Sequence, residues 1–329
     1  MTHLSYPPSN SVNDFIDSNF TSVQYSSFDN AVSIVKKIGY NALIAKMDIK
    51  FAFRLLPCYP GDFRILGFKI GSEFYIDKCM PMGCSISCSI FEKCSTFLHW
   101  LTQYEAGSSD LNHYLDDFFF AGLAETSDCQ SLMKAFINVC KRLNVPIADE
   151  KTEGPTCIME YLGLTINTRD MTIQIPEKKL KELLSQLKLA FSKSLKQLQS
   201  LCGSLAFCTR AIPAGRAFSR RLYMATSKAK KTYHLIRITN ELFHDLMTWK
   251  MFIENFHGTS FILDENWLTN FDIQLFSDSA GKGIGKCCGC YFMGKWAFLP
   301  FLKLYQLLWQ YFYGTISLKR RELFSISTI

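Results

Sequence analysis

The sequence lacks long apolar runs: no stretch reaches about 18 uninterrupted apolar residues, the length that a membrane-spanning helix needs. Its first 20 residues are polar and contain Pro7 and Pro8, without the basic-then-apolar order of a secretory signal peptide. Only 20% of the 329 residues are charged and 48% are hydrophobic, which excludes a disordered chain. We therefore expect a folded intracellular protein of about two or three domains, in the cytoplasm or nucleus, neither secreted nor membrane-bound.

The 13 cysteines lack the repeated spacing of a disulfide scaffold. Their one tight group, Cys287-Cys288-Gly289-Cys290, has no second pair of cysteines or histidines at the spacing of a zinc site. We interpret the cysteines as small buried residues in a reducing compartment, and not as zinc ligands.

Positive charge is concentrated in one segment. Between residues 176 and 231 there are 13 lysines and arginines but only two acids, whereas the rest of the chain has 23 basic and 27 acidic residues. Such a segment indicates a polyanionic partner, most often nucleic acid. A solvated helical face is the alternative interpretation, but it accounts more readily for a few lysines than for an excess of 11 positive charges in one segment.

Two adjacent acids, Asp116 and Asp117, lie between aromatic residues in the stretch His113-Tyr114-Leu115-Asp116-Asp117-Phe118-Phe119-Phe120. Aromatic residues favour strands and aspartates favour turns, so the pattern predicts a β-hairpin with both acids at its tip. Neighbouring carboxylates repel each other unless a hard divalent cation such as Mg²⁺ binds them. Taken alone, the pair also fits an ordinary exposed turn.

Asp48 is a second candidate for the same cation, because it ends the apolar, strand-like run from Ala42 to Ile49. A carboxylate at the end of a buried strand is costly unless it is paired or bound to metal. Its distance from Asp116, 68 residues along the chain, suits two strands brought together in one sheet.

Hydrophobic spacing predicts the order of the remaining elements. Residues 42–175 alternate strands and helices, as in an α+β sheet with helices on one face. They include a hairpin of residues 63–70 and 73–76, a helix over residues 85–101 with Ile90, Phe91, Phe97, Leu98 and Leu101 as apolar positions, and a hairpin of residues 161–166 and 171–175. Leucines at helical spacing predict basic helices over residues 180–205 and 215–231, followed by a helix over 240–256 and strands over 272–280, 283–292 and 295–298.

Five segments occur in the order of the palm motifs of reverse transcriptases: Lys46-Met47-Asp48-Ile49-Lys50-Phe51-Ala52-Phe53-Arg54, Met80-Pro81-Met82-Gly83-Cys84-Ser85, Tyr114-Leu115-Asp116-Asp117, Glu150-Lys151-Thr152 and Tyr161-Leu162-Gly163-Leu164. They resemble most the DIRS-like, tyrosine-recombinase retrotransposons, in which a ribonuclease H domain follows the polymerase. Leu275-Phe276-Ser277-Asp278-Ser279-Ala280 resembles the opening strand of that domain.

The resemblance implies a right-hand polymerase with palm, fingers and helical thumb, followed by the N-terminal part of a ribonuclease H-like α/β domain. The implied boundaries are 1–155 for partial fingers and palm, 156–235 for the primer-grip hairpin and basic thumb, 236–270 for a connection helix and 271–329 for a truncated ribonuclease H-like domain. Asp278 and Glu322 match two carboxylates of a ribonuclease H site, but the sequence ends before the other two, so we expect no ribonuclease H activity.

The resemblance also assigns roles to single residues. Asp48 and Asp116 would hold two Mg²⁺ (or Mn²⁺) ions with support from Asp117, which is the two-metal arrangement of phosphoryl transfer. Phe53 would exclude a ribose 2′-hydroxyl and Lys151 would protonate pyrophosphate; otherwise they are a core aromatic and a loop lysine. The remaining implied contacts are Met82, Gly83 and Ser85 with the nascent base pair and template, and Tyr161, Leu162 and Gly163 with the primer.

The implied partners are an RNA template, a DNA primer or RNA–DNA hybrid, and dNTPs, with a tyrosine recombinase and a capsid-like protein from the same element. The chain departs from the motifs at Phe51, usually small or polar, and at Met82, more often Phe or Gln. The sequence also begins after the finger strands that family members carry. An inactive remnant that only binds nucleic acid is therefore the alternative function, and an unrelated α+β binding protein would require five accidental motifs.

Overall fold

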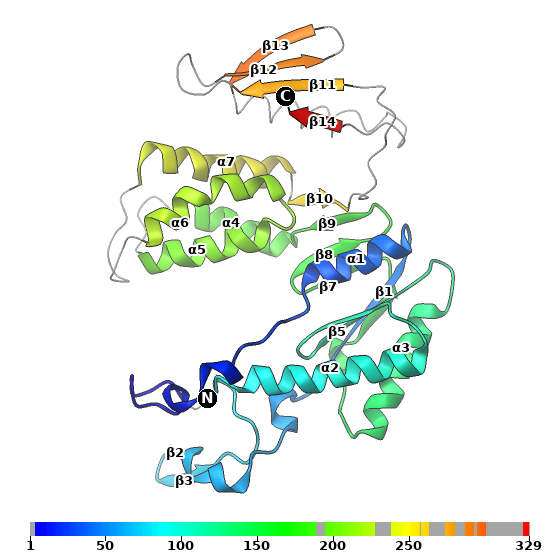
Figure 1. Cartoon of the computed structure of the whole chain (residues 1–329), viewed down its shortest axis with the longest axis vertical. Coiled ribbons are helices and arrows are strands. Elements are labelled where there is room, and N and C mark those ends of the chain that lie inside the picture. Colours follow the sequence, from blue (N-terminus) through cyan, green and yellow to red (C-terminus); the bar gives the residue numbers. More distant parts are fainter. Residues whose placement is uncertain are drawn as a thin grey trace. The chain divides into compact units, whose positions relative to one another are not determined.

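The computed structural model describes residues 4–188, 195–227, 238–256, 258–262, 274–279, 287–292, 295–300 and 325–328 (Figure 1). Residue contacts divide the chain into two compact units, Met1–Ile262 and Leu263–Ile329. The sequence-based boundary between residues 270 and 271 lies outside the described residues. No helix among the described residues is long and apolar enough to span a membrane.

The first unit is built around an antiparallel sheet of four strands in the order β4-β5-β1-β6. Its strands are β1 (Leu43–Asp48), β4 (Leu111–Tyr114), β5 (Asp117–Gly122) and β6 (Glu153–Thr156). The predicted hairpin is confirmed, but only Asp116 lies in its turn, because Asp117 is already the first residue of β5.

Strand β5 is buried on both faces, because its consecutive phenylalanines point alternately to opposite sides of the sheet. Phe119 packs in the core that includes α1 (Phe28–Ile38), while Phe118 and Phe120 pack in the core with α2 (Ser87–Ala106) and α3 (Asp128–Arg142). Helices thus cover both faces of the sheet. The helices within residues 42–175, α2 and α3, share one face, as predicted for that segment, and the other face is covered by α1, which precedes it.

The predicted helix over residues 85–101 is α2, and two of its apolar positions, Phe91 and Leu98, are buried, but its buried face also contains polar residues. Phe97 is 49% exposed and Ile90 36%, whereas Glu92, Ser95 and Thr102 are buried. Helix α2 therefore faces the sheet with a partly polar surface.

A second four-stranded sheet has the order β10-β9-β8-β7. It comprises β7 (Ile158–Tyr161), β8 (Leu164–Asn167), β9 (Thr172–Gln174) and β10 (Thr259–Phe261). The predicted segment 161–166 is divided by a turn at Leu162 and Gly163, which have φ angles of 45° and 78°. Strand β8 pairs with β9 as predicted, and β7 adds a further hairpin.

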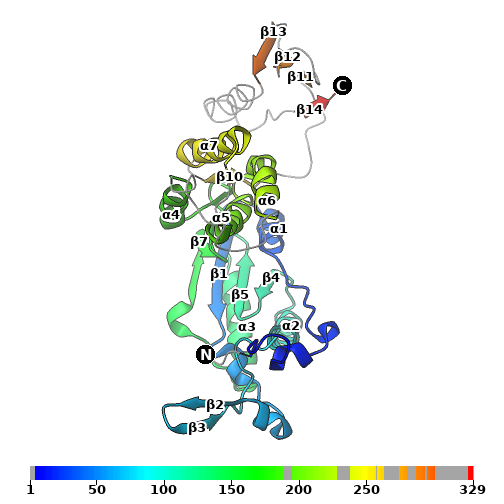
Figure 2. The ribbon, with the colours of Figure 1, turned by 90° about the vertical axis from the view of Figure 1, so that its left-hand side faces the viewer.

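The described part of the basic segment is largely helical, as predicted, but the predicted helix over 215–231 begins as a 3₁₀ helix (Pro213–Phe218), and residues 189–194 and 228–231 lie outside the described residues. Helices α4 (Glu177–Lys188), α5 (Leu195–Cys208), α6 (Arg220–Ser227) and α7 (Asn240–Phe256) bury their leucines together with Trp249. In both ribbon views these helices gather at one end of the central sheet (Figures 1 and 2). The hairpin of β2 (Gly67–Ile70) and β3 (Glu73–Ile76) lies at the other end.

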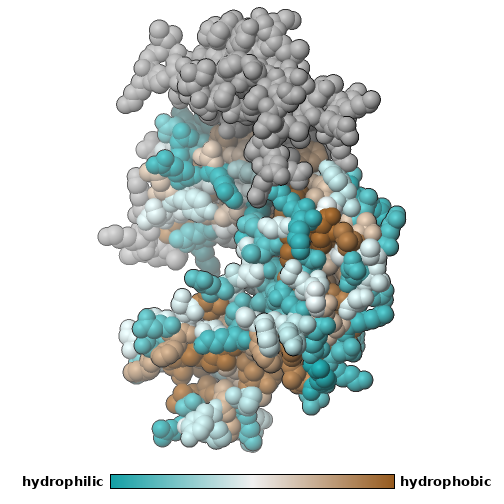
Figure 3. All heavy atoms as spheres, turned by 45° about the vertical axis from the view of Figure 1, so that its right-hand side comes forward, coloured by the Kyte–Doolittle hydropathy of each residue, from teal (hydrophilic) through white to brown (hydrophobic). Residues whose placement is uncertain are grey.

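Apolar residues are concentrated on the surface toward the hairpin end of this unit, where Figure 3 shows a brown area. Ile70, Phe74 and Ile76 of the hairpin are each more than half exposed. The hairpin therefore buries little of its apolar surface against the described part of the chain.

Short 3₁₀ helices connect the elements of the unit: η1 (Val12–Phe15), η2 (Ser18–Phe20), η3 (Ala52–Leu55), η4 (Pro60–Ile65), η5 (Asp149–Lys151) and η7 (Pro213–Phe218).

In the second unit the described residues form a sheet in the order β13-β12-β11-β14. Its strands are β11 (Gln274–Ser279), β12 (Cys287–Phe292), β13 (Lys295–Pro300) and β14 (Ser325–Thr328), and β11 runs parallel to β14. Asp278 lies on β11 opposite Gly289, and Glu322 lies outside the described residues. The ribonuclease H-like assignment stays a prediction.

Candidate active site

The ladder between β1 and β5 brings the three predicted acids together. Asp48, the last residue of β1, is the direct partner of Asp117, the first residue of β5. Asp116 precedes it in the turn, and its backbone carbonyl accepts a hydrogen bond from the Ile49 amide at 3.0 Å. Residues 68 positions apart in the sequence thus place their carboxyl groups at one end of the central sheet.

Burial and neighbouring negative charge raise the pKa values of two of these acids, Asp116 and Asp117. Burial raises the pKa of Asp117 to about 6, and the charges of Asp116 and Asp48 add to the rise. Burial also raises the pKa of Asp116, with a further contribution from Asp48. Positive charge placed among these groups would favour their ionised forms.

Lys151 supplies part of that positive charge. Its Nζ lies 2.9 Å from Oδ2 of Asp48, although the two residues are 103 positions apart. The hydrogen bond to Asp48 raises the pKa of Lys151. The lysine is thus near the acids, as predicted, but it is paired with one of them.

The acids line a cleft of about 690 Å³, together with the turn between β7 and β8. The predicted residues in its wall are Asp48, Asp116, Asp117, Lys151, Tyr161, Leu162 and Gly163. The sequence analysis missed Lys46, whose Nζ lies 2.8 Å from both Glu153 Oε2 and the carbonyl oxygen of Glu160. The sequence could have indicated Lys46, because it precedes Asp48 by two residues on a predicted strand, and residues two apart on a strand share a face.

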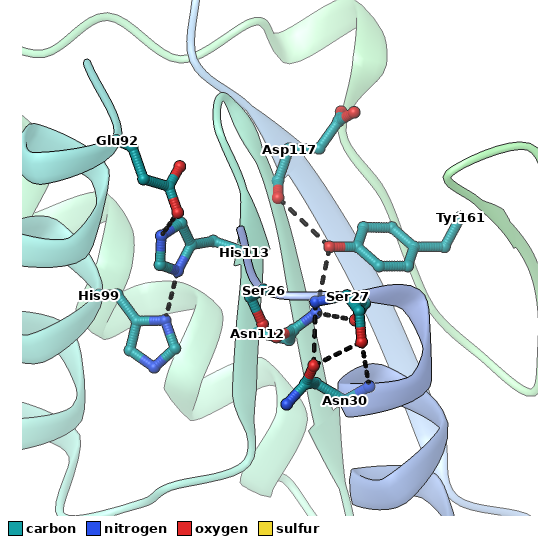
Figure 4. A network of polar contacts seen from close by, with 9 residues as sticks. All are labelled: Ser26, Ser27, Asn30, Glu92, His99, Asn112, His113, Asp117 and Tyr161. Atoms are coloured by element: carbon teal, nitrogen blue, oxygen red, sulfur yellow. Dashed lines mark hydrogen bonds and ion pairs between the residues drawn. The ribbon is translucent and has the colours of Figure 1, made fainter. Parts of the chain in front are cut away.

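Tyr161 belongs to the cleft wall but is almost wholly buried. Its ring is only 1% exposed and packs 5.0 Å from the ring of Phe119. Its hydroxyl donates to the carbonyl oxygen of Asp117 at 3.4 Å (Figure 4). Next to it, Lys179 Nζ donates to the carbonyl oxygen of Gly163 at 3.0 Å and so connects the turn to helix α4. The Tyr161 side chain therefore supports strand β5, and the turn at Leu162 and Gly163 lines the cleft.

The other predicted contact residues lie outside the cleft wall. Phe53 packs edge-on against Phe91, with ring centroids 5.1 Å apart. The side-chain amide of Asn13 donates to the Gly83 carbonyl and accepts from the Ser85 amide, each at 2.9 Å, and so fixes the loop that contains Met82. The structure thus gathers the acids, the lysine and the β7–β8 turn, but not these four residues.

The donor set agrees in kind with a divalent cation, since three carboxyl groups offer hard oxygen ligands. Among the described residues, however, no group of three or more His, Cys, Asp or Glu side chains is arranged to hold a metal ion as it stands. The ammonium of Lys151 contacts Asp48 instead. A cation would therefore bind here with displacement of Lys151 and rotation of the carboxyl groups.

Comparison with known proteins agrees with this geometry. Residues 7–166 match the family "Reverse transcriptase (RNA-dependent DNA polymerase)". The Gag-Pro-Pol polyprotein of Human T-cell leukemia virus 3 (strain 2026ND) is 23% identical over 166 residues, which are 50% of this chain and 11% of that protein.

Among solved structures, the foamy viral protease-reverse transcriptase dRH in complex with double-stranded DNA aligns with a TM-score of 0.59 and 15% identity, over 97% of this chain and 54% of that one. The foamy viral protease-reverse transcriptase in complex with an RNA/DNA hybrid aligns with a TM-score of 0.55 and 15% identity, over 97% of this chain and 42% of that one. The chain thus spans about half of these structures and a tenth of the polyprotein. Its fold is the predicted reverse transcriptase polymerase fold, and residues 7–166 are similar to the reverse transcriptase family.

Proposed function

We propose that this chain is the polymerase part of a retroelement RNA-directed DNA polymerase, which adds dNTPs to the 3′-hydroxyl of a primer. The observation that supports this most is the pairing of Asp48 with Asp117 beside Asp116, in the wall of a cleft that also contains the β7–β8 turn. RNA template, DNA primer and RNA–DNA hybrid are the proposed partners. The solved relatives were bound to double-stranded DNA and to an RNA/DNA hybrid.

Two Mg²⁺ or Mn²⁺ ions would be held by Asp48 and Asp116, with Asp117 in support. When bound, such ions lower the pKa of the attacking hydroxyl and neutralise charge on the triphosphate. Lys151, released from Asp48, would donate a proton to the leaving pyrophosphate. Phe53 would discriminate against a ribose 2′-hydroxyl, and the turn at Leu162 and Gly163 would contact the primer.

We propose that the retroelement is DIRS-like, and this subtype rests only on the resemblance of the sequence motifs. A tyrosine recombinase and a capsid-like protein would be further products of the same element. An intracellular location is proposed with it, because the ten cysteines between residues 58 and 208 are free thiols, as in a reducing compartment. Sequencing the genomic neighbourhood and imaging the tagged protein test these proposals. A retroviral integrase gene in place of the recombinase gene would contradict the subtype.

A remnant that binds nucleic acid without catalysis is the second candidate. The ion pair between Lys151 and Asp48 favours it, because a lysine that stayed there would exclude a cation from one carboxylate. Both candidates predict salt-sensitive duplex binding, so binding does not separate them.

Primer extension on an RNA template separates the two functions. Purified protein is incubated with Mg²⁺ or Mn²⁺, primer, template and dNTPs. The variant Asp116→Asn removes a proposed ligand, and Asp128→Asn on helix α3 is the matched control. Extension by the native and control proteins but not by Asp116→Asn establishes the polymerase. No extension by any of them, with hybrid binding retained, establishes the remnant.

A further inference from the structure

The strand before the catalytic turn lies at an edge of its sheet. Among the described strands, β4 pairs only with β5, so side chains have to anchor its other side. Asn112 and His113 are consecutive on β4 and therefore point to opposite faces. Both are buried, with 3% and 5% of their surface exposed. Each face of the strand is thus anchored by one polar side chain.

Asn112 anchors the strand on the side of α1. Its amide nitrogen donates to the Ser27 carbonyl at 3.3 Å and to the Tyr161 hydroxyl at 3.5 Å, and its carbonyl oxygen accepts from the hydroxyl of Ser26 (Figure 4). These partners also hold the start of helix α1, because Ser27 is its N-cap.

His113 anchors the strand on the side of α2 through two titratable partners. Its Nδ1 lies 2.7 Å from Nδ1 of His99, and its Nε2 lies 3.3 Å from Oε1 of Glu92 (Figure 4). Its ring also stacks on Phe118, with centroids 5.4 Å apart. The Nε2 contact is an ion-pair distance and not a hydrogen bond, and Nε2 has no hydrogen-bond partner among the described residues.

Helix α2 brings its polar groups to His113 on one face, since Glu92, Ser95 and His99 are spaced by three and four residues. Glu92 is 7% exposed and Ser95 is fully buried; Oε2 of Glu92 and Oγ of Ser95 have no hydrogen-bond partner among the described residues. Apolar side chains would fill this space without the cost of burying a carboxylate and two imidazoles. Packing alone therefore does not account for the three titratable groups.

The distances restrict where the protons lie. One of two nitrogens 2.7 Å apart has to donate and the other to accept. Burial lowers the pKa of His99 to about 4, with a contribution from His113, while Gln103 and Glu92 act in the opposite direction; His99 is thus neutral at pH 7. A carboxylate facing Nε2 of His113 favours a proton on that nitrogen, so in neutral His113 the Nδ1 atom accepts from His99.

We propose that Glu92 is a positioning residue for the polymerase site: it keeps the proton of His113 on Nε2 and so holds β4 and its turn, which carries Asp116, against helix α2. Glu92 touches neither the cleft nor the acids in its wall and acts through His113. The inference rests on the proposed function, because the turn matters for polymerisation only if its acids do.

The test compares Glu92→Leu, which cannot accept a hydrogen bond, with Glu92→Gln, which can. Glu105→Gln, at the C-terminal end of the same helix and paired with Arg142, is the control. Three quantities are measured: imidazole tautomers by ¹⁵N-histidine NMR with His99→Gln for assignment, hydrogen exchange of the peptide 111–120, and the kinetics of primer extension.

The expected native spectrum shows His113 protonated at Nε2 and not at Nδ1, and Glu92→Gln keeps this form. Glu92→Leu is expected to speed exchange of the hairpin peptide by at least about tenfold, with peptides from helix α7 unchanged. It should lower kcat for nucleotide addition by about tenfold and leave the affinity for primer–template unchanged. Glu92→Gln and Glu105→Gln should stay within about threefold of the native kcat.

Two results would overturn the inference. One is a neutral His113 that carries its proton on Nδ1 in the native protein. The other is a Glu92→Leu variant whose peptide 111–120 exchanges hydrogen at the native rate. If Glu92→Leu does not fold, the native and Glu92→Gln spectra still decide. If no protein extends a primer, the proposed function fails, whereas NMR and exchange still test the positioning role of Glu92.

Discussion

The ammonium of Lys151 and a divalent cation would compete for the same carboxylate. Because Lys151 Nζ lies 2.9 Å from Asp48 Oδ2, a metal ion reaches Asp48 only when this pair opens. We expect Lys151→Ala to bind Mn²⁺ more tightly, by about two- to fivefold, which corresponds to an ion pair whose lysine is largely exposed. Electron paramagnetic resonance titration of free Mn²⁺ measures the change.

The same variant should extend primers more slowly, since the proposed proton donor is lost. Lys134→Ala on helix α3 removes an exposed lysine away from the cleft and should change neither quantity. Weaker Mn²⁺ binding by Lys151→Ala would show that the lysine does not compete with metal.

Asp117 should make the metal-free protein less stable as the pH rises. Its pKa is raised from 3.8 to about 6, so the folded state holds this proton more tightly than the unfolded state. The resulting stabilisation is present below pH 4 and is lost as the pH rises through 6. Asp117→Asn cannot ionise, so its melting temperature should exceed the native value by a margin that grows between pH 4 and pH 7.

Thermal unfolding of both proteins in chelator, at several pH values, measures this margin. Asp128→Asn serves as the control for charge loss at the surface. A margin that is constant with pH would contradict the raised pKa of Asp117.

At the scale of the element, packing in the basic helical region depends on a close approach of Gly215 to Trp249. A Cβ at Gly215 would lie 2.2 Å from the Trp249 ring, which is fully buried and donates from Nε1 to Ser219 Oγ at 3.2 Å. Since the ring cannot yield easily, Gly215→Ala should lower the free energy of unfolding by about 1–3 kcal/mol. Denaturant titration measures it.

Gly203 in helix α5 is the matched control, because it lies in a helix interior. Apart from its chain neighbours and the backbone of its own helix, no atom lies within 4 Å of the position that a Cβ would take there. Gly203→Ala should raise the free energy of unfolding by about 0.5–1 kcal/mol, the difference in helix propensity. Equal effects of the two substitutions would contradict the close packing at Gly215.

Elements with strong local signals were predictable from the sequence. Aromatic residues around Asp116 indicated the hairpin, and the apolar run before Asp48 indicated its strand. The register that sets Asp48 against Asp117, and the approach of Lys151 to Asp48, depend on long-range packing that no local pattern encodes. The apolar positions of helix α2 did not indicate that Glu92 and Ser95 are buried beside His113, because a period of apolar residues says nothing about buried polar ones.

At the scale of the whole molecule, charge is divided between an acidic cleft and a basic helical segment. Three acids meet at one end of the central sheet, while residues 176–231 carry 13 basic and two acidic residues. Metal ions would bind at the first site and duplex phosphates along the second. Catalysis and duplex binding should therefore respond separately to substitution.

This separation predicts how salt affects binding of an RNA–DNA hybrid. Lys188 on α4 and Lys196 on α5 are exposed. If both contact phosphates, replacing them with alanine should lower the slope of log affinity against log salt concentration by about two units, because each contact releases about one counterion. The control replaces Lys134 and Lys141 of α3 with alanine and changes net charge equally. Fluorescence anisotropy across a salt series measures the slopes. Equal slopes for the two double variants would mean that net charge, and not the basic helices, attracts the hybrid.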